Sequence, residues 1–588
     1  MTSIVVWNKS FPGFEPSHFA SHPFTGSLGC WHVTSCAAPV LLPGENGWLF
    51  ASARLDNRAD VAARLEFSSD QARVLTDSEL LSAAYGAWGA QCGEHMLGAW
   101  CFVALDARTG TITLGRDALG LAPLYYAAKR NRLTFASRLP DLLWLEGGGR
   151  RLNPMALAQL GYGHKRDTST FFAGLSKAPA AQVLSVGADG SVLRRVRYWD
   201  PGAVPKLRYP RDEDYVEAFA GLYDEVVNNA LTPGAKVGIA LSSGLDSSSI
   251  AALAAPRMAA SGYRLQAYSW APGRRINTVP PRGRFWDERP QVAQLAARIG
   301  NIDVTTVEGN SGGLLATIRQ MLKTVEEPSN ALAGWHWYHR VWSRAAADGI
   351  GVLLTGDFGN YTVSLDRRNH AVPGWRDRYH AFRHRLRNRH LGRHTHARML
   401  VRPDFVERML ADCPPQDPAL TARWRKASHP LRSFYNILQS GGASLQCELG
   451  EAMQLEMRMP AIDRRMVDFC CGVPSEQHAR HGQTKLLMRR AFVGRLPDTL
   501  LWNRQRGLSG GDVVQALAAE KEEVFALLDA AARCPLTREA LDLPWLQARA
   551  ARLGLDGSQS LDVMDAGLLM RGLTYMMFLQ GFDDVAAK

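Results

Sequence analysis

The sequence, 588 residues long, lacks the features that mark membrane, secreted and zinc-binding proteins. No run of 18 apolar residues occurs, and the segment from Met1 to Asn8 has neither a basic start nor a long apolar stretch. The nine cysteines are scattered and form no paired Cys-x-x-Cys sets, so neither a disulfide framework nor a zinc site is expected. We therefore predict a soluble, cytoplasmic protein without a membrane partner.

Acidic residues are scarcer than basic ones, 56 against 68, and the net charge is +12. Much of the excess lies between Arg376 and Arg402, where nine arginines and five histidines face the single acid Asp377. A solvated helical face is the common role of such a run, and no zinc finger or RNA-recognition signature accompanies it. We predict no nucleic acid partner and keep contact with a peptide or a delivery partner as the alternative for this segment.

Low-complexity tracts and fixed-period repeats are also absent. The length exceeds what one hydrophobic core usually supports, so two domains are expected. Prolines gather at residues 199–205, where the hydrophobic periodicity stops. This composition predicts an interdomain connection there, with domains over residues 1–205 and 206–588.

Hydrophobic periodicity differs between the two halves. The first half is strand-rich, with a helix after Thr76, whose spacing to Glu79 is that of a capping box. The second half alternates strands with helices, which is the pattern of a parallel α/β sheet, and after about residue 370 it is almost wholly helical. The predicted strands include 48–55, 97–105, 237–241, 265–270 and 351–354, and the predicted helices include 78–88, 214–231, 248–260 and 290–299.

The loop after the predicted strand 237–241 carries the strongest chemical signal. Backbone N–H groups at the start of the following helix bind anions, Gly244 lets the backbone approach an oxygen-rich ligand, and the serine hydroxyls can donate to phosphate. Asp246 would repel a bare phosphate, so it predicts a magnesium ion between carboxylate and pyrophosphate. The alternative is an ordinary strand-to-helix turn. The loop reads Leu241, Ser242, Ser243, Gly244, Leu245, Asp246, Ser247 and Ser248.

This loop resembles the Ser-Gly-Gly-x-Asp-Ser pyrophosphate loop of the ATP pyrophosphatase superfamily, with Ser243 in place of the first glycine. Two further clusters, at 353–361 and 455–463, and the segment 485–490 are similar to the motifs of asparagine synthetases. The resemblance implies an α/β fold whose C-terminal domain is adenine-nucleotide α-hydrolase-like, with a parallel sheet and many helices. It also implies that ATP is cleaved between its α and β phosphates and that AMP is transferred to an acid.

The same resemblance assigns roles to single residues. It places ATP on the loop 241–248 with Ser269 and Gly356, and magnesium on Asp246, Asp357 and Asn360. Lys485 is the expected catalytic lysine, because its charge can stabilise the phosphate and the tetrahedral intermediate. A solvated lysine at the start of a helix is the alternative. For Glu456, which can pair with Arg458, a catalytic role and a purely structural role both stay open.

The first domain resembles the class II glutamine amidotransferase (Ntn-type) domain of these synthetases, most clearly at residues 115–126. Active relatives carry a cysteine nucleophile directly after the initiator methionine, whereas this chain has Thr2. The family's Asn-Gly oxyanion donor aligns with Ser52 and Ala53, and its Arg-Leu segment has no counterpart between Trp31 and Phe50. We predict that the domain is a degenerate scaffold that does not hydrolyse glutamine.

Without that source of ammonia, the amine must come from the substrate or from another molecule. Two branches of the family work in this way: β-lactam synthetases and the cyclases of lasso peptides. Residues 355–364 are more similar to the cyclases, in which an asparagine follows the glycine and Thr-Val-Ser continues. Glu326 and Glu327 suit the same branch and are expected either to receive a proton from the amine or to start the next helix.

The prediction is therefore a lasso peptide cyclase that uses ATP and magnesium. It would adenylate an Asp or Glu side chain of a leaderless ribosomal precursor peptide and join it to the N-terminal amine. A leader peptidase and a leader-binding protein are the expected partners. A β-lactam or other small-molecule amide synthetase and a non-catalytic interaction scaffold are the alternatives.

Overall fold

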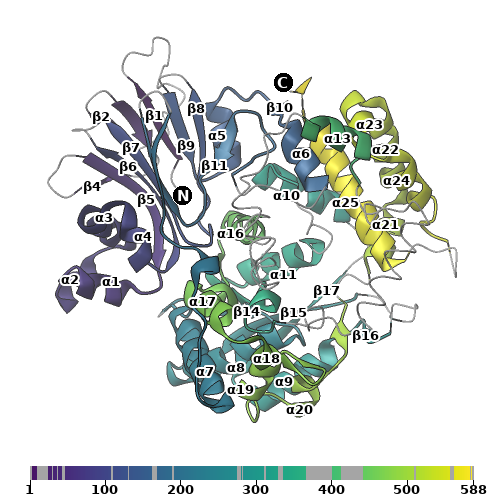
Figure 1. Ribbon diagram of the computed structural model, residues 1–588. Helices are drawn as coiled ribbons and strands as arrows, with labels where there is room; N and C mark the ends of the chain where they lie inside the picture. Colours follow the sequence, from purple (N-terminus) through teal and green to yellow (C-terminus); the bar gives the residue numbers. More distant parts are fainter. Residues whose placement is uncertain are drawn as a thin grey trace.

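Two antiparallel sheets form the N-terminal part of the molecule (Figure 1). The computed structural model describes residues 3–8, 24–28, 31–35, 38–42, 47–106, 110–129, 132–161, 168–187, 191–232, 234–273, 280, 282–309, 313–328, 335–365, 400–411, 441–508, 512–555, 562–582 and 584–585. One sheet has the order β11-β8-β9-β1-β3-β2 and the other β13-β12-β7-β6-β5-β4. Thr2 and residues 376–399 of the basic segment lie outside the described residues.

The strands of these sheets are β1 (Ser3–Asn8), β2 (Phe24–Leu28), β3 (Trp31–Ser35), β4 (Val40–Leu41), β5 (Gly47–Leu55), β6 (Gly98–Asp106), β7 (Thr111–Arg116), β8 (Tyr125–Lys129), β9 (Arg132–Ala136), β11 (Leu175–Lys177), β12 (Gln182–Val186) and β13 (Val192–Arg197). The helices of this part are α1 (Arg58–Arg64), α2 (Ser69–Val74), α3 (Asp77–Trp88), α4 (Cys92–His95), α5 (Leu139–Leu145) and α6 (Pro154–Gly161). Helix α3 begins at the predicted capping box: Thr76 Oγ1 accepts from the Glu79 amide and the Glu79 carboxylate accepts from the Thr76 amide. The capping prediction is confirmed.

The second part is built on a five-stranded sheet of order β17-β15-β14-β18-β19, in which every pair is parallel. Its strands are β14 (Val237–Ala240), β15 (Leu265–Ala271), β17 (Ile302–Glu308), β18 (Val352–Thr355) and β19 (Glu456–Arg458). The helices that alternate with them are α7 (Asp212–Asn229), α8 (Leu245–Ala260), α9 (Arg289–Ile299), α10 (Leu314–Val325) and α11 (Trp335–Ala347). The predicted two-domain α/β fold is confirmed.

Helices make up most of the described chain after residue 400, as the periodicity predicted. They are α13 (Pro403–Ala411), α16 (Gly442–Ala452), α17 (Arg464–Gly472), α18 (Ser475–His478), α19 (Leu486–Ala491), α20 (Asp498–Leu501), α21 (Val513–Ala519), α22 (Lys521–Arg533), α23 (Pro535–Ala540), α24 (Leu543–Ala550) and α25 (Val563–Leu579). Short strand pairs join distant segments: β16 (Arg284–Phe285) pairs with β22 (Arg506–Gly507), and β10 (Arg151–Leu152) pairs with β23 (Asp584–Val585). None of the described helices has the length and apolar character needed to cross a membrane.

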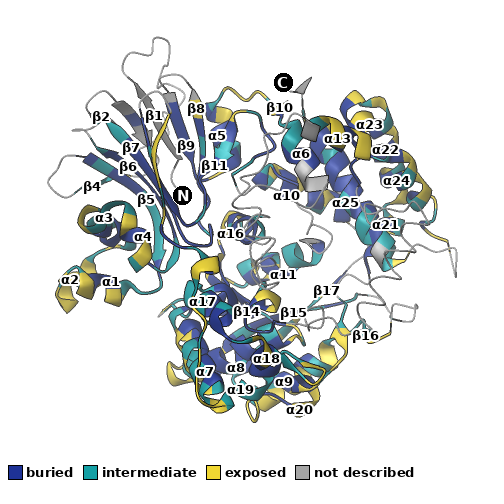
Figure 2. Ribbon diagram, in the orientation of Figure 1, coloured by how far each residue is buried: buried dark blue, intermediate teal, exposed yellow. Residues whose placement is uncertain are grey.

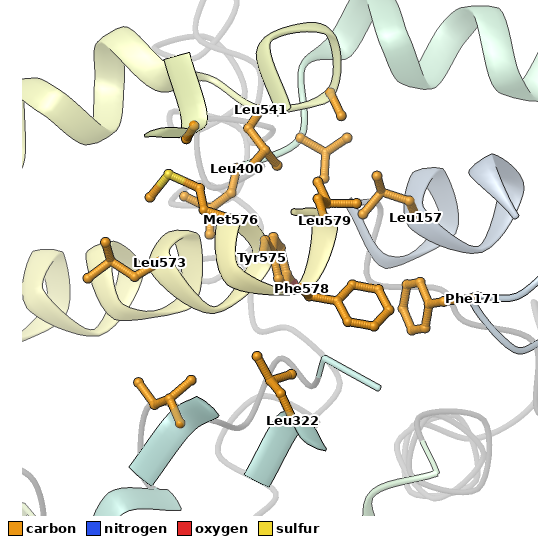
Figure 3. Packing of buried hydrophobic residues seen from close by; sticks show 14 of the residues in the cluster. Leu157, Phe171, Leu322, Leu400, Leu541, Leu573, Tyr575, Met576, Phe578 and Leu579 are labelled. Carbon is orange, nitrogen blue, oxygen red and sulfur yellow. The ribbon is translucent and has the colours of Figure 1, made fainter. Parts of the chain in front are cut away.

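Buried apolar residues do not stop at the predicted domain boundary. Strands β6, β7, β12, β14 and β18 and the inner faces of many helices are mostly buried (Figure 2). One continuous cluster contains Leu157 and Phe171 from the first 205 residues together with Leu573 and Phe578 of α25. The rings of Phe171 and Phe578 meet edge to face with their centroids 5.2 Å apart (Figure 3). The C-terminal helix therefore completes a core that begins in the first domain.

Phe578→Ala tests this shared core. Phe578 is only 3% exposed, and removing a buried phenylalanine ring costs about 3–5 kcal/mol of unfolding free energy. Because the cluster joins both parts of the chain, we expect a lower Tm with a single unfolding transition in calorimetry. Val74→Ala, at an exposed position, is the matched control and should leave Tm unchanged. Two separate transitions in the Phe578 variant would contradict a shared core.

Candidate active site

A cavity of about 680 Å³ opens at the carboxyl ends of β14, β15 and β18. Ligands of parallel α/β sheets bind at this edge, and the volume lies in the range of small-molecule sites. The cavity brings together most of the residues predicted to bind ATP, the metal or the reacting groups. Its lining includes Leu241, Ser242, Ser243, Gly244, Leu245, Asp246, Ser247, Ser269, Gly356, Asp357, Asn360 and Lys485.

Hydrogen bonds between serines shape the loop before α8. Ser247 Oγ lies 3.0 Å from Ser242 Oγ and accepts from the Ser242 amide at 3.1 Å. Ser248 is fully buried, and its hydroxyl donates to the Ser242 carbonyl at 3.3 Å rather than facing the cavity. Helix α8 begins at Leu245, three residues before the predicted start, so Asp246 and Ser247 belong to its first turn, where helical N–H groups lack helical acceptors. The loop is thus preshaped for an anion.

Glycines of the segment after β18, rather than Gly244, allow the close approach of two backbones. Gly244 has φ −73°, which any residue can adopt, so no positive φ is required there, and its predicted close approach to a ligand stays a prediction. A Cβ on Gly356 would lie 2.4 Å from the Ser247 amide nitrogen, and one on Gly359 would lie 2.4 Å from Asp246 Oδ1. The two motifs therefore touch directly, and only glycine fits at these positions.

Two carboxylates in the cavity suit a magnesium ion. Asp246 Oδ1 is buried and has no hydrogen-bond partner among the described residues. Asp357 is close enough for the charge of Asp246 to raise its pKa, although burial is the main cause of that rise. Among the described residues no group of three or more His, Cys, Asp and Glu side chains forms a metal cluster. An ion here would take its other ligands from phosphate and water.

Lys485 extends its ammonium group to the third predicted metal residue. Its Nζ donates to Asn360 Oδ1 at 3.2 Å, so the amide oxygen of Asn360 is engaged by a cation. Lys485 itself has left-handed backbone angles, φ 58° and ψ 31°, at the point where the hairpin of β20 (Ala479–Arg480) and β21 (Gln483–Thr484) turns into α19. A non-glycine residue in this region costs of order 1–3 kcal/mol and is typical of functional sites. The catalytic role of Lys485 stays a prediction.

Glu288, in the cavity wall, contacts the loop directly but was not predicted. Its Oε2 accepts from the Ser243 amide at 2.6 Å and from the Ser243 hydroxyl at 2.8 Å. A glycine at position 243 could not make the second bond, so Ser243 adds a contact that the usual loop lacks. In the sequence Glu288 only precedes a helix, and no motif links it to the loop 45 residues earlier.

Tyr338 of α11 forms the other unpredicted contact. Its hydroxyl donates a hydrogen bond to Asp357 Oδ1, and both side chains line the cavity. Burial raises the pKa of Asp357 above its usual range, and this hydrogen bond partly opposes the rise. Burial also raises the pKa of Tyr338, which keeps the phenol protonated. Tyr338 stacks on Trp337 with centroids 3.8 Å apart, which gives this side of the cavity an aromatic wall.

Three carboxylates predicted to be catalytic are not among the described residues that line the cavity. Glu326 is held by Arg150, Glu327 by Lys177, and Glu456 lies between Arg54 and Arg458. Each glutamate has one cation partner from the first 205 residues, and this long-range pairing gives no local signal in the sequence. The contacts favour the structural alternative for all three glutamates, and a catalytic role for them stays a prediction.

One part of the molecule has a parallel α/β sheet with a serine-rich loop after β14, and the other part has two antiparallel sheets. Together they have the architecture of a two-domain synthetase. Residues 218–569 match the asparagine synthase family model, and residues 32–199 match the glutamine amidotransferase domain. The chain belongs to the asparagine synthase family and is an ATP-dependent amide ligase. The amidotransferase match ends at residue 199 and the synthase match begins at residue 218. The predicted domain boundary at residues 205 and 206 lies between them and stays a prediction.

Sequence relatives agree with this membership. Asparagine synthetase [glutamine-hydrolyzing] 3 of Bacillus subtilis (strain 168) is 23% identical over 484 residues, covering 79% of this chain and 75% of that protein. Asparagine synthetase [glutamine-hydrolyzing] 2 of the same organism is 21% identical over 453 residues, covering 72% of this chain and 57% of that protein. Amidase chyE of Penicillium rubens is 24% identical over 293 residues, covering 48% of this chain and 42% of that protein.

Gly356→Ala tests the contact between the two motifs. The added methyl group would lie 2.4 Å from the Ser247 nitrogen, so the loop must shift. Overpacking of this kind costs about 1–3 kcal/mol, which corresponds to roughly 5- to 150-fold weaker ATP binding. Calorimetric titration with magnesium and ATP measures the change. Gly351→Ala, with no atom within 4 Å of its added methyl group, is the control, and equal affinities of the two variants would contradict this account.

Proposed function

We propose that this ligase is a lasso peptide cyclase, which closes a macrolactam between an Asp or Glu side chain and the N-terminal amine of a leaderless ribosomal peptide. The observation that carries the proposal is the segment from Thr355 to Ser364, which is similar to these cyclases and contributes Thr355, Gly356, Asp357 and Asn360 to the lining of the cavity. Asn360, characteristic of that segment, faces Lys485 instead of offering a carboxylate to the metal.

In the first step, an oxygen of the substrate carboxylate would attack the α-phosphorus of ATP, and pyrophosphate would leave. The loop 241–248 offers hydroxyl and amide donors for the pyrophosphate, and Lys485 provides a positive charge on the same side of the cavity. Asp246, with its unpaired oxygen, would hold the magnesium ion, which neutralises phosphate charge when bound. The neutral Asn360 leaves more of that task to Asp246.

In the second step, the peptide amine would attack the activated acyl carbon, and AMP would leave. The amine must lose a proton, and in this proposal Asp357 takes it rather than binding the metal, with Asp246 holding the magnesium ion and Glu326 and Glu327 held by the other domain. The Tyr338 hydroxyl fixes the orientation of Asp357. Because amine and acid belong to one folded peptide, a high effective molarity replaces a second binding event.

The walls of the cavity support a peptide substrate. Trp286, Trp337 and Trp502 line it together with Arg504 and Arg506, which offers apolar surface and positive charge to a chain bearing a carboxylate. The same proposal includes a leader peptidase that supplies the leaderless peptide and a leader-binding protein that delivers it. Magnesium and ATP complete the reaction, as expected in this family.

A pH profile tests the role of Asp357. Below its pKa the carboxyl group keeps its own proton and cannot accept another, so the rate of cyclisation should rise as the pH rises through this raised pKa. Tyr338→Phe removes a hydrogen bond that stabilises the ionised carboxylate, so the rising limb should move to higher pH. Substrate-dependent pyrophosphate release measured across pH gives both results. An unshifted limb in the Tyr338 variant would contradict this assignment.

Mass spectrometry of a candidate peptide tests the function itself. With enzyme, ATP and magnesium, the leaderless peptide should lose one water and release AMP and pyrophosphate. The same peptide with an acetylated N-terminus should stay linear, because its amine is blocked. A dehydrated product from the acetylated peptide, or release of pyrophosphate only with small amino acids, would overturn the peptide cyclase proposal and favour a small-molecule amide synthetase. If the protein binds ATP but releases no pyrophosphate with any candidate substrate, the result would indicate a non-catalytic scaffold.

A further inference from the structure

Two adjacent glutamates at the end of α10 are each bound by a cation of the N-terminal domain. Arg150 donates from Nη1 and Nη2 to the two oxygens of Glu326 at 3.0 and 2.6 Å, and Lys177 Nζ lies 2.7 Å from Glu327 Oε2. Glu326 is the residue at which α10 ends, and its backbone is left-handed with φ 52°. The two ion pairs therefore bind the N-terminal domain to the sharp turn that follows α10.

The pair of Lys177 and Glu327 is removed from solvent. Their side chains are 6% and 4% exposed, and Lys177 also lies over the ring of Tyr125 at 5.2 Å. A buried ion pair in which one partner is lost leaves an uncompensated charge, so its geometry is strongly enforced. Exposed pairs have little such effect. The Lys177–Glu327 contact thus fixes the turn after α10 relative to the N-terminal domain.

The N-terminal domain also makes hydrogen bonds to α16. Tyr125 Oη donates to Glu448 Oε1 at 2.8 Å, and Arg116 Nη2 donates to Ser444 Oγ at 3.2 Å. Burial raises the pKa of Glu448, while the charge of Lys177 opposes the rise. The N-terminal domain therefore holds both α10 and α16 through buried polar contacts.

Helix α10 connects this grip to the active site. It packs against α11, and Met321 and Val325 of α10 share a buried cluster with Val341 and Trp342 of α11. Helix α11 begins eight residues after Glu327 and carries Tyr338, which binds Asp357 in the cavity. If the end of α10 moved, α11 would move with it, because close-packed interiors transmit strain. The aromatic residues Trp337 and Tyr338 of α11 would then shift in the cavity.

We propose that the N-terminal domain is a positioning element of the synthetase site: Arg150 and Lys177 hold Glu326 and Glu327, and so set α11 and the Tyr338–Asp357 contact. Lys177 and Arg150 act as positioning residues, and neither is among the residues that line the cavity. The inference does not depend on the identity of the substrate. It gives a domain without the usual glutaminase residues a part in amide formation.

Hydrogen exchange of the full chain tests the proposal without a substrate. In Lys177→Met, amide exchange over residues 335–347 should become at least about tenfold faster, while residues 245–260 of α8 keep their rate. Glu327→Gln should give the same pattern, and the double variant should be no worse than the stronger single one, since both break one contact. Arg408→Met, in the exposed pair with Glu539, is the matched control and should change neither segment.

Kinetics provides the second readout, with any substrate that the enzyme adenylates. We expect kcat to fall by at least about tenfold in Lys177→Met with KM for ATP within about twofold, because misplaced groups slow chemistry while the phosphate loop is untouched. If Lys177→Met fails to fold, Arg150→Gln at the half-buried pair is measured instead. Equal acceleration of exchange in both segments, or unchanged exchange over 335–347, would overturn the proposal whether or not a peptide is cyclised.

Discussion

The contact between the pyrophosphate loop and the segment after β18 is the constraint on which the site depends. The two neighbouring parallel strands β14 and β18 end at one edge, and the backbones beyond them meet with no room for a side chain at Gly356 or Gly359. This approach places Asp246 near Asp357 and lets Lys485 reach Asn360. The arrangement of charged and polar groups at this edge follows from one steric requirement.

The two aspartates of the cavity, Asp246 and Asp357, have different surroundings. Asp246 lies in the first turn of α8, and its Oδ1 has no hydrogen-bond partner among the described residues. Asp357 is buried against the Tyr338 hydroxyl, and burial raises its pKa. Two acids of the same chemistry therefore differ in their surroundings.

The N-terminal domain is joined to the synthetase domain by apolar and by ionic contacts. Apolar packing between Phe171 and Phe578 makes the C-terminal helix part of a shared core. Buried pairs such as Lys177 with Glu327 add directionality, because a charge-assisted hydrogen bond has a preferred geometry. These contacts make the N-terminal domain structurally necessary, since removing it would expose a core and leave buried charges unpaired.

The sequence by itself determined the two-domain α/β fold and predicted that the loop 241–248, Gly356 and Lys485 belong to one site, and these residues, except Ser248, line one cavity. These depend on local patterns: hydrophobic periodicity, a strand-to-helix turn and short motifs whose order defines a parallel sheet. Only the tertiary structure decided the fates of Glu326, Glu327 and Glu456, and it also revealed Glu288 and Tyr338 as site residues. A carboxylate has the same chemistry in a cavity wall or beside a buried lysine, and its partner, often more than 100 residues away, becomes known only when the domains pack together.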